Sequence, residues 1–231
     1  TMKKINIALA SFFLLLSPIT YSEILEVFTW KSSPGKIPTL IKHMSESAVI
    51  HTNLGAEAHA YQLDVGSPVQ AFDYVLRWDD LESWAATKEA QSTSKEFQDF
   101  WKKVGRKPSG ELIASLEGIN LDASVKADSF NDYSVYRVFI WDPAPGKLSE
   151  VLNNFAKAKE IHESLGAKID SYREGVGGTG NLHYLMNFKS WADMAEFTNK
   201  LNESKDWMEF QSSTDPNSST LVKSFQGFKL F

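Results

Sequence analysis

Large apolar side chains occupy both sides of the expected strand at residues 23–30. Phe28 and Trp30 point to one side and Val27 and Thr29 to the other, so we expect this strand to be covered on both faces. The Pro-Gly pair at residues 34–35 breaks the pattern and opens a helix, which Gly55 ends. The apolar positions at helical spacing are Ile37, Leu40, Ile41, Met44, Ala48 and His51.

Two short alternating runs follow, at residues 56–63 and 70–78, and the Gly-Ser-Pro turn between them predicts a hairpin. Asp79 and Asp80 then cap a second expected helix, and residues 112–119 predict a fourth strand. This second helix carries Leu81, Trp84, Ala85, Phe97, Phe100 and Trp101 as apolar positions. The order of elements is that of a ferredoxin-like unit, in which four antiparallel strands carry two helices on one face.

The same pattern is present twice in the chain. The segment 27–56 recurs 111 residues later as 138–167, with eleven identities in thirty positions. Average residue usage would give roughly two identities by chance. We therefore expect two copies of one unit, at residues 23–121 and 133–231, joined by a polar linker at 122–132.

The repeated residues carry a resemblance to a known group. Each first strand is followed by Pro-Gly-Lys, and each first helix ends in His-x-x-Leu-Gly, at residues 51–55 and 162–166. The third expected strand of each copy ends in an aromatic residue. The helix that follows it contains the motif Ser-Lys-x-x-x-x-Phe, at residues 94–100 and 204–210. In these motifs the chain resembles the dimeric α/β-barrel superfamily, which includes antibiotic-biosynthesis-monooxygenase-like and NIPSNAP-like proteins. The resemblance implies an α+β fold in which two tandem ferredoxin-like βαββαβ units pack sheet to sheet as a pseudo-twofold α/β barrel.

The resemblance to the haem-degrading branch of that superfamily would imply three site residues in each copy. That branch uses an Asn on the first strand, a Trp in the second helix and a His four residues beyond the aromatic of the Ser-x-x-aromatic motif. No Asn occurs on the first strand, the Trp position holds Gln91 and Leu201, and the His position holds Trp101 and Gln211. The resemblance therefore argues against haem oxygenation, and we expect no cofactor.

The N-terminal segment has a different character. Lys3 and Lys4 precede an apolar run at residues 5–19 and small residues at 20–22, which is typical of a secretory signal peptide spanning residues 1–22. An uncleaved membrane anchor or a buried helix are the alternatives. We expect a periplasmic or secreted protein with no stable membrane association after signal cleavage. The sequence has no cysteine, which excludes disulfides and a thiol-linked lipid anchor.

The 231 residues carry a formal net charge of −5, without a basic cluster. A nucleic-acid partner is therefore not expected, because the phosphate backbone attracts a basic surface. We expect a small-molecule ligand as the partner, and a monomer or homodimer.

Two histidines, His51 and His162, occupy the same place at the ends of the two first helices. A histidine there could act as a ligand or general base toward a molecule bound between helix and sheet. Alternatively, a cationic ring could close the helix by bonding its free carbonyl groups. The other expected ligand-binding residues are Trp30, Trp141, Tyr74 and Tyr184.

The hairpins offer candidate catalytic residues. His59 and Asp73 lie at equal distances from a turn centred near residue 66, and the aligned positions of the second copy hold Asp170 and His183. We expect each acid and imidazole to face each other across the strands, as half of a proton-transfer site or as an ion pair between the sheets. No pattern predicts a metal site.

These features predict an exported tandem α/β-barrel protein that binds a small, largely apolar molecule in a pocket between helices and sheet. A cofactor-independent monooxygenase or isomerase acting on a small organic substrate is the alternative. The motifs specify a fold more than an activity, so the sequence leaves the choice between binding and catalysis open.

Overall fold

The structure is a computed structural model that describes residues 22–231, within which the chain forms eight strands and six helices. The first repeat contains β1 (Ile24–Ser32), α1 (Ile37–Asn53), β2 (Glu57–Leu63), β3 (Ala71–Trp78), α2 (Leu81–Thr93), α3 (Lys95–Arg106) and β4 (Gly110–Asn120). The second contains β5 (Val135–Pro143), α4 (Leu148–Ser164), β6 (Lys168–Glu174), β7 (Leu182–Phe188), α5 (Trp191–Glu203), α6 (Lys205–Ser213) and β8 (Ser219–Lys229). The expected signal peptide lies outside the described residues, apart from its last position, Ser22.

The strands form one closed antiparallel barrel in the order β1-β3-β2-β8-β5-β7-β6-β4. Each repeat supplies a four-stranded sheet, and the two sheets join where β2 pairs with β8 and where β4 pairs with β6. These two junctions are short, because each pairs only three residues per strand. The expected fold of two ferredoxin-like units forming one α/β barrel is confirmed.

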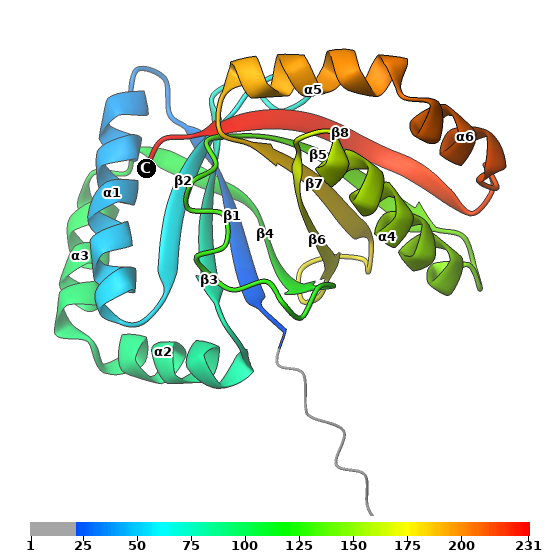
Figure 1. Cartoon of the computed structure of the whole chain (residues 1–231). Coiled ribbons are helices and arrows are strands. Elements are labelled where there is room, and N and C mark those ends of the chain that lie inside the picture. The colour runs from blue at the N-terminus through cyan, green and yellow to red at the C-terminus, as the bar shows by residue number, and fades with distance from the viewer. Residues whose placement is uncertain (1–21) are drawn as a thin grey trace, which may run out of the picture.

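The helices cover the outside of the barrel, with those of the two repeats on different sides of it (Figure 1). Alternate residues of β3 point outward and pack against α1, which accounts for the aromatic-rich face of this strand. This outer core contains Phe72, Tyr74, Leu76 and Trp78 together with Leu40, Met44 and Ala48. Strand β7 repeats the arrangement with Tyr184, Met186 and Phe188.

The second helix of each repeat is broken where the sequence predicted one continuous helix. Ser94 ends α2 and begins α3, and Ser204 does the same between α5 and α6. Each serine has an extended backbone, and its hydroxyl accepts a hydrogen bond from the amide of the third residue that follows. A serine in this conformation is a good N-cap, so the Ser-Lys motif starts a new helix that closes over the sheet.

The inside of the barrel is mixed in polarity. An apolar cluster formed by both repeats includes Leu25, Tyr136, Val138, Tyr172 and Leu185. Beside it, the connection between the repeats covers one part of the interior, since the Phe130 ring lies 5.0 Å from the Arg77 guanidinium. No helix within residues 22–231 is long and apolar enough to cross a membrane.

Candidate functional site

Each repeat encloses a cavity between its helices and the outer face of its sheet. The cavity of the second repeat has a volume of about 600 Å³, and that of the first has a volume of about 480 Å³. Volumes of this size are typical of sites for small organic molecules. The two cavities lie in equivalent places because the repeats place the same elements around them.

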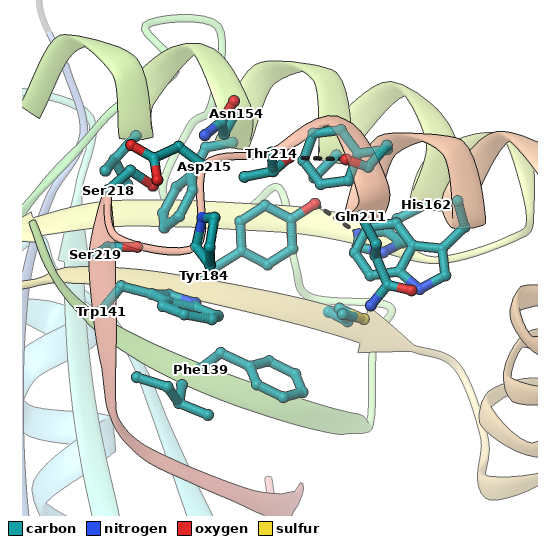
Figure 2. Close-up of a pocket in the computed structure, with 18 of the residues that line it drawn as sticks. Phe139, Trp141, Asn154, His162, Tyr184, Gln211, Thr214, Asp215, Ser218 and Ser219 are labelled. Atoms are coloured by element: carbon teal, nitrogen blue, oxygen red, sulfur yellow. Dashed lines mark hydrogen bonds between the residues drawn. The ribbon is translucent and has the colours of Figure 1, made fainter. Parts of the chain in front are cut away.

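Strands β5 and β7, helices α4 and α6 and the start of β8 form the walls of the larger cavity (Figure 2). The aromatic residues that line it are Phe139, Trp141, Phe155, Tyr184, Trp207 and Phe210. His162 lies at one end of the cavity, and Asp215, Ser218 and Ser219 lie at the other. The middle of the cavity is therefore apolar, and its polar groups are few.

His162 and Tyr184 form a buried hydrogen-bonded pair. The imidazole Nδ1 lies 2.8 Å from the phenolic oxygen, and the two residues are 2 % and 4 % exposed. Burial lowers the pKa of His162 to about 4 and raises the pKa of Tyr184 well above its usual range. Both side chains are therefore neutral at physiological pH. A neutral ring does not fit the alternative of a cationic ring that closes the helix, because removing the imidazole from water penalises its charged form.

The other imidazole nitrogen of His162, Nε2, is buried and has no hydrogen-bond partner among the described residues. Around the ring, the Trp207 indole lies at a centroid distance of 4.6 Å and Phe197 at 5.7 Å. A buried polar atom without a partner is rare in folded proteins, and it calls for an explanation.

The first repeat contains the same pair with two additional contacts. The Nδ1 atom of His51 lies 2.8 Å from the Tyr74 hydroxyl, 3.0 Å from the Ser47 carbonyl oxygen and 3.2 Å from the Ser47 hydroxyl. Burial lowers the pKa of His51 to about 4. Its cavity also has Lys88 in the wall, with the ammonium 2.6 Å from a carboxylate oxygen of Glu26.

Three comparisons with known proteins bear on this architecture. The NIPSNAP family model matches residues 136–225, which lie in the second repeat. None of the curated proteins matches the sequence significantly. Several solved structures match nearly the whole chain.

A structure described as a proposed monooxygenase from Fusobacterium nucleatum subsp. nucleatum ATCC 25586 has a TM-score of 0.61 and 10 % identity, covering 90 % of this chain and 92 % of that one. A proposed chlorite dismutase has a TM-score of 0.55 and 12 % identity, with 91 % and 95 % covered. An anthrone oxidase-like protein has a TM-score of 0.53 and 12 % identity, with 92 % of each chain covered. This chain has the dimeric α/β-barrel fold. At such low identity the likeness shows the fold alone.

All six expected ligand-binding residues of this α/β barrel line the cavities. Trp30, His51 and Tyr74 line the first, and Trp141, His162 and Tyr184 line the second. The alternation of β1, β3, β5 and β7 places these aromatic rings on the helix side of the sheet. Their role in ligand binding stays a prediction.

The four positions tested for a haem-degrading signature also lie in the cavity walls. Gln91 and Trp101 line the first cavity, and Leu201 and Gln211 line the second. The described residues lining the second cavity include no lysine or arginine. A haem would bring two carboxylates with no cation to pair with them there, so the second cavity does not fit this group.

The expected pairing of His59 with Asp73 is wrong. In the α/β barrel His59 lies opposite Val75, and Asp73 lies opposite Tyr61. In the second hairpin Asp170 lies opposite Leu185, and His183 lies opposite Tyr172. Each hairpin is displaced from the expected register by two residues, which keeps the side chains on the expected face but separates the expected partners.

The four candidate catalytic residues therefore have other partners. Asp73 accepts a hydrogen bond of 2.6 Å from Thr29, and His59 Nε2 lies 2.8 Å from the Asn131 side-chain oxygen. His183 Nε2 lies 2.7 Å from a Glu174 carboxylate oxygen. These contacts lie on the inner side of the barrel or at its ends, whereas the two large cavities lie outside it.

Asp170 belongs to a buried ionic cluster that the sequence did not reveal. The Arg77 guanidinium donates to Glu23 at 2.6 Å and to Asp170 at 2.7 Å, and the Asn120 amide donates to both carboxylates. Burial raises the pKa of Glu23 to about 7, and the nearby Asp170 carboxylate adds to the rise. An arginine among the inward-facing residues of β3 was the available signal. The described residues contain no cluster of three or more side chains that could hold a metal ion.

Proposed function

We propose that the protein binds small, largely apolar molecules in its helix-sheet cavities, and that the second repeat holds the principal site. The observation that supports this is the larger cavity itself, with its aromatic walls and one buried histidine whose Nε2 has no hydrogen-bond partner within residues 22–231. Ligand sites are typically concave and apolar, with a few polar groups that fix orientation.

Catalysis is the second candidate, since two of the similar structures are described as a proposed monooxygenase and an anthrone oxidase-like protein. The electrostatics of the site favour binding. A general base works best when its pKa lies near the operating pH, and the pKa of His162 is about 4. We therefore propose that the protein binds its ligand and that His162 does not abstract a proton from it.

Nile red, an uncharged apolar dye, tests the proposal by fluorescence titration. The protein should bind the dye at one or both cavities. Ala158→Leu should remove most of the binding at the second cavity, because Ala158 lines that cavity and is 7 % exposed. Val49→Leu, on an exposed part of α1, is the control and should leave binding unchanged. No saturable binding, or equal binding by both variants, would reject the second cavity as the principal site.

We also propose that the protein is exported, with small-molecule ligands as its partners. The support is the pattern of lysines, apolar run and small residues at 1–22. An intact mass of the exported protein that includes these residues would contradict a cleaved signal.

A further inference from the structure

The unpartnered nitrogen of His162 indicates what kind of ligand the second cavity takes. A neutral imidazole carries one proton, so one of its nitrogens donates a hydrogen bond and the other accepts one. The position of that proton follows from counting the partners of His162 and Tyr184. Among the described residues Nδ1 has the Tyr184 hydroxyl as its partner, and Nε2 has none.

If the proton were on Nδ1, that nitrogen would donate to the Tyr184 oxygen. The phenolic hydrogen would then have no acceptor, and the Nε2 lone pair would also be unpaired. If the proton is on Nε2, the Tyr184 hydroxyl donates to Nδ1, and the Nε2 hydrogen alone is unpaired. Each buried polar group without a partner costs free energy, so the second arrangement is favoured.

The charges in the cavity wall also determine which ligand charge the cavity favours. The described residues lining this cavity include Asp215 but no lysine or arginine. The nearby Lys147 is already bonded to Glu150 at 2.7 Å and to Asp215 at 3.3 Å. An anionic ligand would therefore lose its hydration without gaining a cation. Burial disfavours protonation of His162, so the imidazole does not supply that cation either.

We propose that the second cavity selects an uncharged apolar ligand with one hydrogen-bond acceptor oxygen, such as an aromatic ketone or ester, which the Nε2 hydrogen of His162 binds. This inference rests on the proposed function and adds the class of ligand to it. Since Trp207 lies against the imidazole, a ligand that reaches Nε2 also contacts this indole or displaces it.

The first cavity differs from the second in its polar groups. Nδ1 of His51 lies 3.0 Å from the Ser47 carbonyl oxygen, which can only accept a hydrogen bond, and it also lies 3.2 Å from the Ser47 hydroxyl and 2.8 Å from the Tyr74 hydroxyl, which can donate one. The wall of this cavity also contains the ammonium of Lys88. The preference for a neutral acceptor is therefore assigned to the second cavity alone.

Equilibrium dialysis with three naphthalenes of similar size tests the inference. 2-Acetylnaphthalene is a neutral ketone, 2-isopropylnaphthalene lacks the oxygen, and 2-naphthoate is an anion at pH 7.5. The protein should bind the ketone about tenfold more tightly than the hydrocarbon, which is the effect of one ordinary hydrogen bond, and should bind the anion least. His162→Phe should abolish the preference for the ketone while still binding the hydrocarbon. Val49→Leu, at an exposed position of α1 that lines neither cavity, should keep the preference.

A ketone preference that survives in His162→Phe, or tighter binding of 2-naphthoate than of the ketone, would overturn the inference and leave the proposed function standing. Failure of all three compounds to bind would reject both. Nitrogen-15 spectra of histidine-labelled protein give a second measurement that does not depend on the folding of the Phe variant. Nε2 of His162 should show the shift of a protonated nitrogen and should move on addition of the ketone. The shift of an unprotonated nitrogen there would overturn the inference.

Discussion

Arg77 of the first repeat and Asp170 of the second are joined by a hydrogen bond of 2.7 Å inside the barrel. The same guanidinium binds Glu23, which is fully buried. A single arginine thus binds carboxylates from both halves of the chain, and Asp170 is paired with a cation that the other repeat supplies.

Replacing Arg77 by methionine should strongly destabilise the fold. Two carboxylates would remain buried without a cation, and breaking a buried ion pair in this way costs about 3 to 5 kcal/mol. Urea unfolding measures the change in the free energy of unfolding. Lys103→Met is the matched control, since it removes an ion pair with Glu46 near the surface and should cost less than about 1 kcal/mol. If Arg77→Met lowered the free energy of unfolding as little as Lys103→Met does, the carboxylates of the cluster would be in contact with water.

The cluster should also make stability depend on pH. The folded pKa of Glu23 is about 7, above the unfolded value of 4.5, so the folded state binds more protons between these values. This contribution is fully present below about pH 4.5 and is lost as pH rises through 7. Between pH 6 and 8 the free energy of unfolding should fall by about 1 kcal/mol from this group.

Glu23→Gln should flatten that part of the profile, whatever it does to the absolute stability. Asp73→Asn is the control, because burial raises the pKa of Asp73 to about 6 and its contribution therefore changes mainly at lower pH. Parallel profiles for the wild type and Glu23→Gln between pH 6 and 8 would contradict the raised pKa.

The register of the hairpins leads to a test of coupling. Asp73 is bonded to Thr29, and His59 is bonded to Asn131, so His59 and Asp73 should behave as independent residues. In double-mutant cycles Thr29→Val and Asp73→Asn should show a coupling of about 0.5 kcal/mol or more, whereas His59→Ala and Asp73→Asn should add within about 0.5 kcal/mol. A larger coupling for the second pair would restore the facing arrangement that the register excludes.

The same hairpin shows why the sequence predicted faces better than contacts. Alternation assigns a side chain to a face, and a displacement of two residues does not change that face. The pairing depends on the turn, whose end is held by the other repeat. Val65 accepts from the Gln226 amide, and the Asp64 amide donates to the Gln226 carbonyl. A partner 162 residues away in the sequence cannot be read from the hairpin itself.

The residues of the cavity walls could be predicted because the alternation along a strand assigns each side chain to one face of the sheet. His51, Tyr74 and their counterparts sit on periodic elements, and the repeat placed them twice. The sequence did not reveal the charge states of these histidines and tyrosines, because these depend on burial. It also did not reveal that Ser47 contacts His51, whereas Ala158, at the aligned position, offers His162 no hydroxyl. The ionic cluster at Arg77 was hidden because it forms only when the two sheets close on each other.

Two glycines lie at close contacts between tyrosine side chains and the strands that join the repeats. A Cβ atom on Gly118 would lie 2.6 Å from the Tyr172 ring, and one on Gly227 would lie 2.7 Å from the Tyr136 hydroxyl. Gly118 pairs with Glu174 and Gly227 pairs with Leu63, so both glycines sit at the short junctions between the repeats. A side chain at either position must displace the neighbouring tyrosine, and at Gly227 it would also lie 2.8 Å from the Gln62 carbonyl oxygen.

Gly118→Ala and Gly227→Ala should each lower the free energy of unfolding by about 1 to 3 kcal/mol, the usual cost of overpacking. Gly105→Ala is the control, because its Cβ would have nothing within 4 Å and alanine favours the helix α3. That variant should be neutral or more stable by up to about 1 kcal/mol. Urea unfolding of the three variants separates steric contact from a general effect of replacing glycine. If the junction variants matched Gly105→Ala, the tyrosines would have room to move, and the two sheets would meet less closely at the junctions than the described contacts require.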